Sequence, residues 1–288
     1  MSADLSEIEN TIIGAFAACI VVGTLQPTIY LKNAAAQGLP LTMNPRVLYR
    51  GVGINLGNEM GQLSAQFGVT GSFKKFFPST PLGQLSSAAA AGALVALYVS
   101  PCELFMIQQQ RHGGGLLSTA KGVFEKYGVV RSLQRGLGLA IARDALMVCG
   151  MLGATPVIQT QLLRYASGSS GNGGSGGAAV PTAAATAVAS LAASMLGGTV
   201  GALLSHPFDV LNTCLKGDLD RKTYGGVLDS ARVLLREGGV KRLYNGGLWR
   251  TVNIALTVWI ANECALKLPY LVKPFTRGVL GGFPPPLP

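Results

Sequence analysis

The stretch "SHPFDVLNTCLK", residues 205–216, ends a long apolar run that begins near residue 181. Such a run can cross a bilayer, which takes roughly 20 apolar residues. Pro207 would kink the helix, because proline lacks a backbone donor and clashes with the preceding turn. Asp209 places a carboxylate near the end of the same span. Charges inside membrane helices are costly and usually functional. Recurrence of the stretch elsewhere in the chain would support the interpretation that it has a function.

Two other apolar runs end in the same way. The run "IIGAFAACIVVGTLQP" ends at Pro27, and "SSAAAAGALVALYVSP" ends at Pro101. Small residues stand thirteen and nine positions before each proline: Gly14 and Ala18, Ala88 and Gly92, Ser194 and Gly198. Small residues four apart share a helix face and let helix backbones approach closely in lipid. Three copies at one offset indicate a threefold internal repeat.

A second marker follows each of these runs. "LYRG" ends at Gly51, "LQRG" at Gly136 and "LYNG" at Gly246, and each precedes another apolar span. The sequence thus predicts an all-α membrane protein with six transmembrane helices. They form three tandem two-helix repeats with pseudo-threefold symmetry, and both termini lie on one side. The predicted spans are 9–31, 52–77, 82–108, 138–165, 181–214 and 247–270.

Charge is sparse and unevenly placed. The 288 residues are 49% hydrophobic and 12% charged, whereas a soluble domain carries about 25% charge. Of 23 Lys and Arg, sixteen lie in residues 32–50, 111–135 and 216–250, which connect the spans within each pair. Positive charge on one side of a membrane sets orientation. This alternation with apolar spans argues against a nucleic-acid-binding patch as the source of the net charge of +10.

Two basic segments have helical amphipathic patterns. "LLSTAKGVFEKYG" and "GGVLDSARVLLREGG" predict helices at the membrane surface, with Gly128 and Gly238 as C-terminal caps. The distance from the proline to the closing glycine is 24 residues in repeat one, 35 in repeat two and 39 in repeat three. Repeat one is therefore expected to lack most of this surface helix.

These features divide the chain. We expect repeat one over 1–81, repeat two over 82–166, a flexible Gly/Ser linker over 167–180, repeat three over 181–270 and an extended Pro-rich tail over 271–288. The five cysteines form no C-x-x-C pair, and only two histidines are present. We therefore expect no metal, no other cofactor and no enzymatic activity, and the N-terminus has no cleavable targeting pattern.

The threefold set of motifs resembles the mitochondrial carrier family, and the chain would be a divergent member. In that family, odd helices carry P-x-[DE]-x-x-[KR], and the matrix segments end in a stretch like G-x-x-x-[LF]-[YF]-[RK]-G. The resemblance covers roughly residues 9–270. It implies a multi-pass protein of the mitochondrial inner membrane, with its surface helices in the matrix and both termini toward the intermembrane space.

The resemblance also implies a gate at the matrix end, where the acid of one odd helix pairs with the base of the next. The three motifs read Pro27-Ile29-Lys32, Pro101-Glu103-Met106 and Pro207-Asp209-Asn212. Family pairing would join Ile29 with Met106, Glu103 with Asn212, and Asp209 with Lys32. No acid or base is left facing an unsuitable partner, which fits the cost of burying an unpaired charge. Independent drift of the three motifs is the alternative.

The opposite gate is depleted. The family places [FY]-[DE]-x-x-[KR] at the ends of the even helices, and only Lys74 falls on a matching position, with Glu263 and Lys267 nearby. Alternating access needs two states of comparable free energy. Loss of this opposite gate should therefore shift the equilibrium toward one of the two states.

The family's solute contacts lie on the even helices, seven or eight residues after the closing glycine. They correspond to Asn58, Glu59, Arg143, Asp144 and Asn253. The pair of Arg143 and Asp144 resembles that of carriers of amino acids; alternatively, the two neutralise other buried charges such as Glu59. Family motifs for bound cardiolipin match Arg50-Gly51 and Arg135-Gly136, although these glycines could simply start the even helices.

Two functions fit this sequence. Because both gates are depleted and repeat one is truncated, we favour a derived carrier that serves as an accessory subunit of a larger inner-membrane assembly. The alternative is an active carrier that moves a small amino-acid-like or carboxylate solute by alternating access. The expected partners are membrane lipids, other inner-membrane subunits and a small solute, with no nucleic acid.

Overall fold

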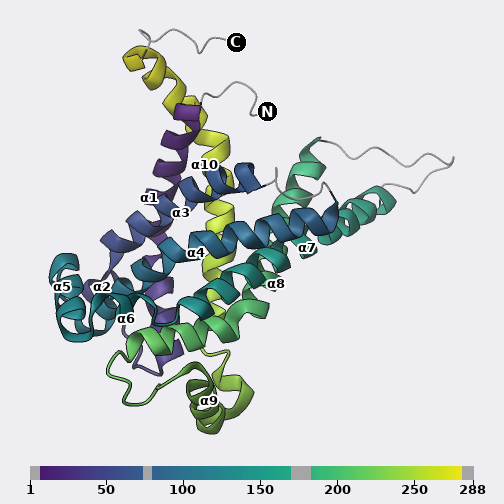
Figure 1. Cartoon of the computed structure of the whole chain (residues 1–288). Coiled ribbons are helices and arrows are strands. Elements are labelled where there is room, and N and C mark those ends of the chain that lie inside the picture. The colour runs from purple at the N-terminus through teal and green to yellow at the C-terminus, as the bar shows by residue number, and fades with distance from the viewer. Residues whose placement is uncertain (1–6, 74–79, 170–182, 281–288) are drawn as a thin grey trace.

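The computed structural model describes residues 7–73, 80–169 and 183–280, which are helical except for short turns and loops. Six long helices form the bundle in Figure 1: α1 (Glu7–Gln37), α3 (Val52–Phe73), α4 (Pro81–His112), α7 (Leu137–Ser169), α8 (Ala183–Gly217) and α10 (Gly247–Leu280). Each packs against the next along the chain, and α10 packs against α1, which closes the ring. The six-helix architecture predicted from the repeats is confirmed.

Four shorter helices lie at one end of the bundle, here called the surface-helix end. They are α2 (Pro45–Leu48), α5 (Leu116–Tyr127), α6 (Val129–Leu133) and α9 (Val227–Arg242). The two predicted amphipathic segments form α5 and α9, and repeat one retains only the four-residue α2. The N-terminal end of α1 and the C-terminal end of α10 lie together at the opposite end (Figure 1).

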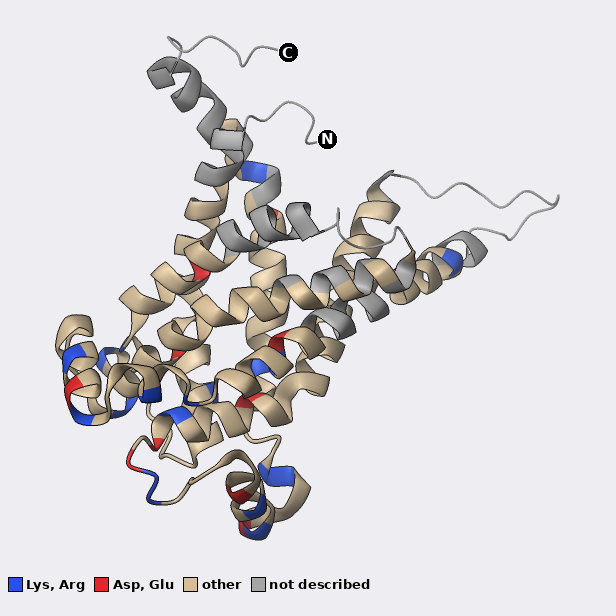
Figure 2. Cartoon of the chain, viewed as in Figure 1, with Lys and Arg blue, Asp and Glu red and all other residues tan. Residues whose placement is uncertain are grey.

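Basic residues are concentrated at the surface-helix end of the bundle. Figure 2 shows Lys and Arg concentrated around α2, α5, α6 and α9 and on the adjoining ends of the long helices. A smaller set of blue and red residues lies further inside the bundle, between the long helices.

The closing glycines show the threefold symmetry in three dimensions. Gly51, Gly136 and Gly246 have φ of +81°, +77° and +84°, a region that favours glycine. Each faces the base position of the next odd helix. A Cβ added to Gly51 would lie 3.1 Å from Met106, one added to Gly246 would lie 2.7 Å from the Lys32 carbonyl, and one added to Gly136 would collide with the Asn212 amide oxygen. A side chain at these glycines would therefore separate neighbouring repeats.

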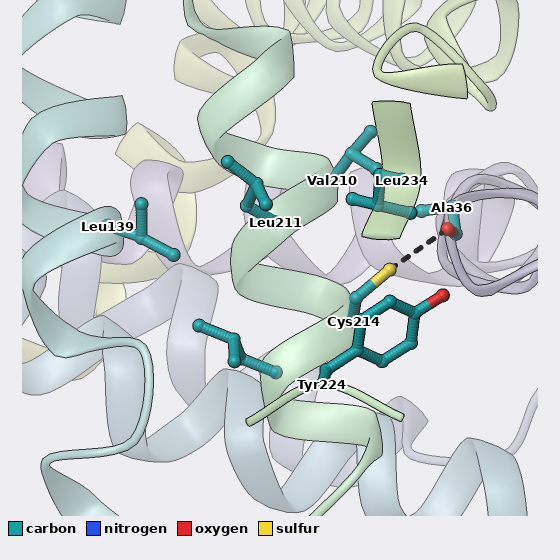
Figure 3. Packing of buried hydrophobic residues seen from close by; sticks show 8 residues of the cluster. Ala36, Leu139, Val210, Leu211, Cys214, Tyr224 and Leu234 are labelled. Atoms are coloured by element: carbon teal, nitrogen blue, oxygen red, sulfur yellow. Dashed lines mark hydrogen bonds between the residues drawn. The ribbon is translucent and has the colours of Figure 1, made fainter. Parts of the chain in front are cut away.

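An apolar cluster fixes α9 to the bundle (Figure 3). Cys214 of α8 is fully buried beside Val210 and Leu211 of the same helix, Leu234 of α9 and Tyr224 of the connecting loop. Its Sγ donates to the carbonyl of Ala36 at 3.2 Å, which links α8 to α1. The Cys214 side chain thus packs as a small, largely apolar group.

The two predicted caps lie at helix interruptions, whereas two other predicted boundaries need correction. Gly128 caps α5 with φ +78°, and α9 is interrupted at the predicted cap, because Gly238 (φ −165°) and Gly239 (φ +64°) are both non-helical and form a kink between two helical parts. Helix α7 continues to Ser169, inside the predicted linker, and α10 continues to Leu280, inside the predicted tail. The helices extend because the strongest breakers, the Gly-rich run and the consecutive prolines, begin only after these points. Residues 170–180 and 281–288 lie outside the described parts.

Two helices of the described chain are long and apolar enough to cross a membrane by composition: α1 over Ile13–Gln37 and α8 over Thr186–Gly217. The other long helices carry more polar side chains, several of which belong to the candidate site.

Candidate functional site

The predicted ion pair between α1 and α8 is present near the surface-helix end. The Lys32 Nζ lies 2.9 Å from Asp209 Oδ2, and the Asp209 side chain is 2% exposed. The predicted amide contact is also present, because Asn212 Nδ2 donates to Glu103 Oε2 at 3.1 Å. Both bonds connect odd helices, as family pairing requires.

Lys216 supplies a base that the sequence analysis missed. It lies one helical turn beyond Asn212, its side chain is fully buried, and its Nζ is 2.9 Å from Glu103 Oε2. Glu103 therefore has a cation from α8 in addition to the amide of Asn212. The spacing of four residues, which puts both side chains on one face of α8, could have revealed it.

The third connection between odd helices is uncharged. Like Lys216, it lies one helical turn beyond the position that family spacing implies. Asn33 Nδ2 of α1 donates to Gln110 Oε1 of α4 at 2.7 Å, and both side chains are buried. These residues stand one turn beyond Ile29 and Met106, the apolar pair that family spacing implies. The three odd helices are thus joined pairwise by polar side chains, and the surface-helix end of the bundle is closed.

Arg143 of α7 joins this network from an even helix. Its Nε and Nη2 donate to Asp144 at 2.8 and 3.1 Å, and its Nη1 donates to Glu103 and, at 3.2 Å, to Asp209. The side chain is 7% exposed. A guanidinium can bind several carboxylate oxygens at once because its donors form a rigid planar fork. Arg143 therefore neutralises other buried charges, as the alternative interpretation predicted, but these are Glu103 and Asp209 and not Glu59.

Arg250 of α10 was also missed. It donates from Nη1 to Asp209 Oδ2 at 2.9 Å and from Nη2 to Ser205 Oγ at 2.8 Å. It stands four residues after its closing glycine, where repeat one has Asn55, which donates to Gln26 at 2.9 Å. A polar residue at this position bonds the odd helix of its own repeat in both cases.

We call the seven charged residues of this network the gate cluster. Its cations are Lys32, Arg143, Lys216 and Arg250, and its carboxylates are Glu103, Asp144 and Asp209. Four cations against three carboxylates leave one positive charge in excess. Charges in the membrane interior are stable only when paired, so this excess is a binding opportunity for an anion.

The remaining predicted contacts have different surroundings. Asn253 of α10 donates to Thr28 Oγ1 of α1 at 2.8 Å. Asn58 is buried, and its Oδ1 has no hydrogen-bond partner in the described structure. Glu59 is partly buried. The structure thus brings Arg143 and Asp144 into the gate cluster, while Asn58, Glu59 and Asn253 lie on α3 and α10 outside it.

The residues predicted to bind lipid differ in availability. The Arg135 side chain is buried and donates to the carbonyls of Leu215, Asp218, Tyr224 and Gly225. It therefore fixes the loop that follows α8. Arg50 is half-buried, and its carbonyl accepts from Gln26 Nε2 at 3.1 Å. Cardiolipin binding at Arg50-Gly51 and Arg135-Gly136 stays a prediction.

The opposite end has weaker connections among the described side chains. Lys267 pairs with Glu263 at 2.7 Å, but both belong to α10, so the pair joins no two helices. Gln159 of α7 donates to Ser190 of α8 at 2.7 Å. Lys74 lies outside the described residues. The described cross-helix network is thus denser at the surface-helix end.

Comparison with known proteins agrees with this geometry. A sequence model described as "Mitochondrial carrier protein" matches residues 183–261. The mitochondrial 2-oxodicarboxylate carrier 1 of Saccharomyces cerevisiae is 30% identical over 224 residues, covering 72% of this chain and 66% of the relative. The chain belongs to the mitochondrial carrier family. Mitochondrial uncoupling protein 6 of Arabidopsis thaliana is 24% identical over 220 residues, covering 71% of this chain and 61% of the relative.

A third relative is the yeast 2-oxodicarboxylate carrier 2, which is 24% identical over 223 residues, or 72% of this chain and 67% of the relative. The matched part of the chain spans less than two thirds of the length of the first two relatives. As a mitochondrial carrier, the protein is a multi-pass protein of the inner membrane. Members of the family are transporters and not enzymes, which confirms that prediction.

Proposed function

We propose that the protein is an active solute carrier that moves a small carboxylate across the inner membrane by alternating access, with Arg143 as its carboxylate-binding cation. The observation that carries this proposal is the position of Arg143. It stands where the family binds solute, and it also holds two acids of the matrix gate, Glu103 and Asp209. Because two relatives are named as 2-oxodicarboxylate carriers, 2-oxodicarboxylates are the first candidates.

This arrangement couples binding to gating. A solute carboxylate presents two oxygens to the guanidinium and competes with Glu103 and Asp209 for its donors. Each gate acid then loses one of its cations, which weakens the connections between the odd helices. A ligand shifts an equilibrium by its differential affinity for the two states, and a solute that replaces gate contacts has that property.

The accessory-subunit interpretation rests on the sparse network at the opposite end and the short repeat one. The reconstituted gate cluster reduces its support, because Lys216 and Arg143 restore charges that family spacing left missing. It predicts comigration with a large complex after mild detergent extraction. Native gel migration with identification of neighbouring subunits distinguishes the two functions.

The transport proposal is tested in liposomes that contain the purified protein. We expect saturable uptake of labelled 2-oxoglutarate, inhibited by succinate more than by the zwitterion carnitine. Arg143→Ala should abolish uptake. The variant should still fold, because Glu103 keeps Lys216, Asp209 keeps Lys32 and Arg250, and Asp144, which loses its cation, is 20% exposed to solvent.

Arg164→Ala is a matched control, since Arg164 lies exposed on the same helix. It should leave uptake unchanged. Unaltered uptake in Arg143→Ala would remove the assigned contact. Absence of 2-oxoglutarate uptake by the wild-type protein, together with comigration in a large complex, would replace the carrier function with the accessory one.

A further inference from the structure

In repeat one, the residue before the kink proline joins the odd helix to the even helix. Gln26 is fully buried, and its Nε2 donates to the carbonyl of Arg50 at 3.1 Å. Asn55 Nδ2 of α3 donates to Gln26 Oε1 at 2.9 Å. Both partners lie beside the closing glycine, one on each side, so these bonds hold the kink of α1 to the start of α3.

Repeat three has the same connection, built from different residues. His206 stands before the kink proline and is also fully buried, and its Nε2 lies 3.2 Å from the Asn245 carbonyl oxygen. A carbonyl oxygen only accepts hydrogen bonds, so Nε2 must carry the hydrogen. Arg250 of α10 donates to Ser205 Oγ of α8 at 2.8 Å. The kink of α8 and the start of α10 are thus also joined by two side-chain bonds.

Repeat two has neither connection. Ser100 stands before the kink proline and is 1% exposed, but its Oγ has no hydrogen-bond partner in the described structure. The position four residues after the closing glycine is Ala140, whose methyl group can neither donate nor accept. A buried hydroxyl group without a partner is costly. The cost is relieved when water reaches Ser100, so it favours opening at this kink.

Near this kink, the described bond between α4 and α7 is the one from Arg143 Nη1 to Glu103. It differs from the connections in the other repeats, because Arg143 is the cation that the proposed carrier uses to bind its solute. A solute carboxylate on the guanidinium competes with Glu103 and weakens this bond. The bonds of Gln26 and His206 do not involve the guanidinium. Solute binding should thus loosen repeat two and leave the other two repeats joined.

From these contacts we infer that the matrix gate opens asymmetrically, with the kink at Ser100 as its hinge. At this kink α4 moves against α7 when solute binds, whereas α1 with α3 and α8 with α10 each move as a fixed pair. Gln26 and His206 are the positioning residues that hold these two pairs together. The repeat symmetry alone would predict three equivalent hinges. The inference rests on the carrier function proposed above.

Amide hydrogen exchange of the full-length protein, measured with and without 2-oxoglutarate, tests this hinge. The amides of Asn55, Ala140 and Arg250 form matched bonds of 3.0, 2.9 and 3.0 Å to the carbonyls of the three closing glycines. After correction for intrinsic rates, 2-oxoglutarate should speed exchange at Ala140 and leave the other two amides unchanged. Loss of a hydrogen bond to a charged group corresponds to about tenfold or more in an opening equilibrium, which is the acceleration expected. Uptake of labelled 2-oxoglutarate into liposomes is measured on the same preparation.

His206→Leu removes the connection of repeat three without touching Arg143. We expect 2-oxoglutarate then to speed hydrogen exchange at Arg250 as well, by roughly two- to tenfold for a neutral bond. His206→Gln should restore the wild-type pattern, because glutamine holds this position in repeat one and its amide can donate to the Asn245 carbonyl. Thr24→Val is the control, since the Thr24 hydroxyl bonds carbonyls of its own helix, and it should leave the wild-type pattern unchanged.

Gln26→Leu applies the same test to repeat one, with the Asn55 amide as its reporter, and replaces His206→Leu if that variant does not fold. Equal acceleration at the three amides, or none at Ala140, in a wild-type protein that takes up 2-oxoglutarate would overturn the hinge and leave the carrier function intact. Acceleration in His206→Leu that is present without solute, or that spreads over the whole chain, would make the role of His206 purely structural and overturn its assignment. A wild-type protein without uptake would overturn the carrier function, and the inference with it.

Discussion

Replacing Lys216 with methionine tests the part of the matrix gate that the family motif does not contain. Its ammonium is fully buried and pairs with Glu103 at 2.9 Å. Methionine keeps most of the volume and removes the charge. Glu103 would retain Arg143 and Asn212, so it would not become an orphan charge. The expected loss is therefore that of one hydrogen bond to a charged group, about 1.5–3 kcal/mol.

The reciprocal change should cost more. Glu103→Gln leaves a fully buried ammonium without a carboxylate, which typically costs about 3–5 kcal/mol. In the double variant neither charge is left unpaired. Its loss should therefore fall short of the sum of the two single losses by roughly 1–3 kcal/mol.

Thermal unfolding in detergent, at one fixed scan rate, measures these differences. At about 2 °C per kcal/mol for a chain of this size, Lys216→Met should lower the unfolding temperature by about 3–6 °C. Lys121→Met removes an exposed partner of Glu125, 3.7 Å away, and should change it by about 1 °C or less. A Lys216 variant indistinguishable from this control, or strictly additive single losses, would refute the assigned role of Lys216.

Three further predictions concern the repeat contacts and the matrix surface. Gly136→Ala should destabilise the protein by about 2 kcal/mol or more, because its φ is +77° and the new Cβ would collide with the Asn212 oxygen. The control Gly53→Ala, whose new Cβ would have nothing within 4 Å, should be neutral or slightly stabilising. Equal unfolding temperatures for the two variants would contradict the close approach of Gly136 to α8. Arg135→Met should speed amide hydrogen exchange across residues 215–226, since four carbonyls lose their donor; unchanged exchange would argue against that role. Hydrogen bonds from Lys126 and Tyr127 lower the pKa of Asp220 to about 2, so the connection of α5 to the loop should persist above about pH 4 and weaken as pH falls toward 2. Proteolysis of α5 at pH 7 and pH 2 checks this, and Asp220→Asn should show the loosened pattern at both pH values; a wild-type pattern that does not vary with pH would count against it.

The repeat spacing predicted the architecture well because it reflects contacts that recur three times. Pro27, Pro101 and Pro207 mark the odd helices, and the closing glycines mark the starts of the even ones. These positions are constrained by backbone geometry, so a short sequence motif is enough to identify them. The C-terminal ends of α7 at Ser169 and of α10 at Leu280 were harder to predict, because they depend on gradual changes in composition.

The partners within the site were less predictable. Family spacing assigns one base to each acid, whereas Asp209 contacts Lys32, Arg143 and Arg250 together. Lys216 took the role of the missing base from one turn away, and a positional comparison of motifs does not register such a shift. Arginines reach across helices, so their partners are set by packing that a linear sequence does not display.

Helix α8 takes part in many of the long-range polar contacts at the surface-helix end. It supplies partners to Lys32 of α1, Glu103 of α4, Arg143 of α7 and Arg250 of α10, and the carbonyl of its Leu215 accepts a hydrogen bond from Arg135. During synthesis and membrane insertion, the first four long helices precede it. Until α8 enters, the ammonium of Lys32 has no carboxylate and Arg135 has no carbonyls to bind. A nascent chain that stops before residue 183 would thus hold uncompensated charge within the lipid, and such truncated products should be poorly retained and readily degraded.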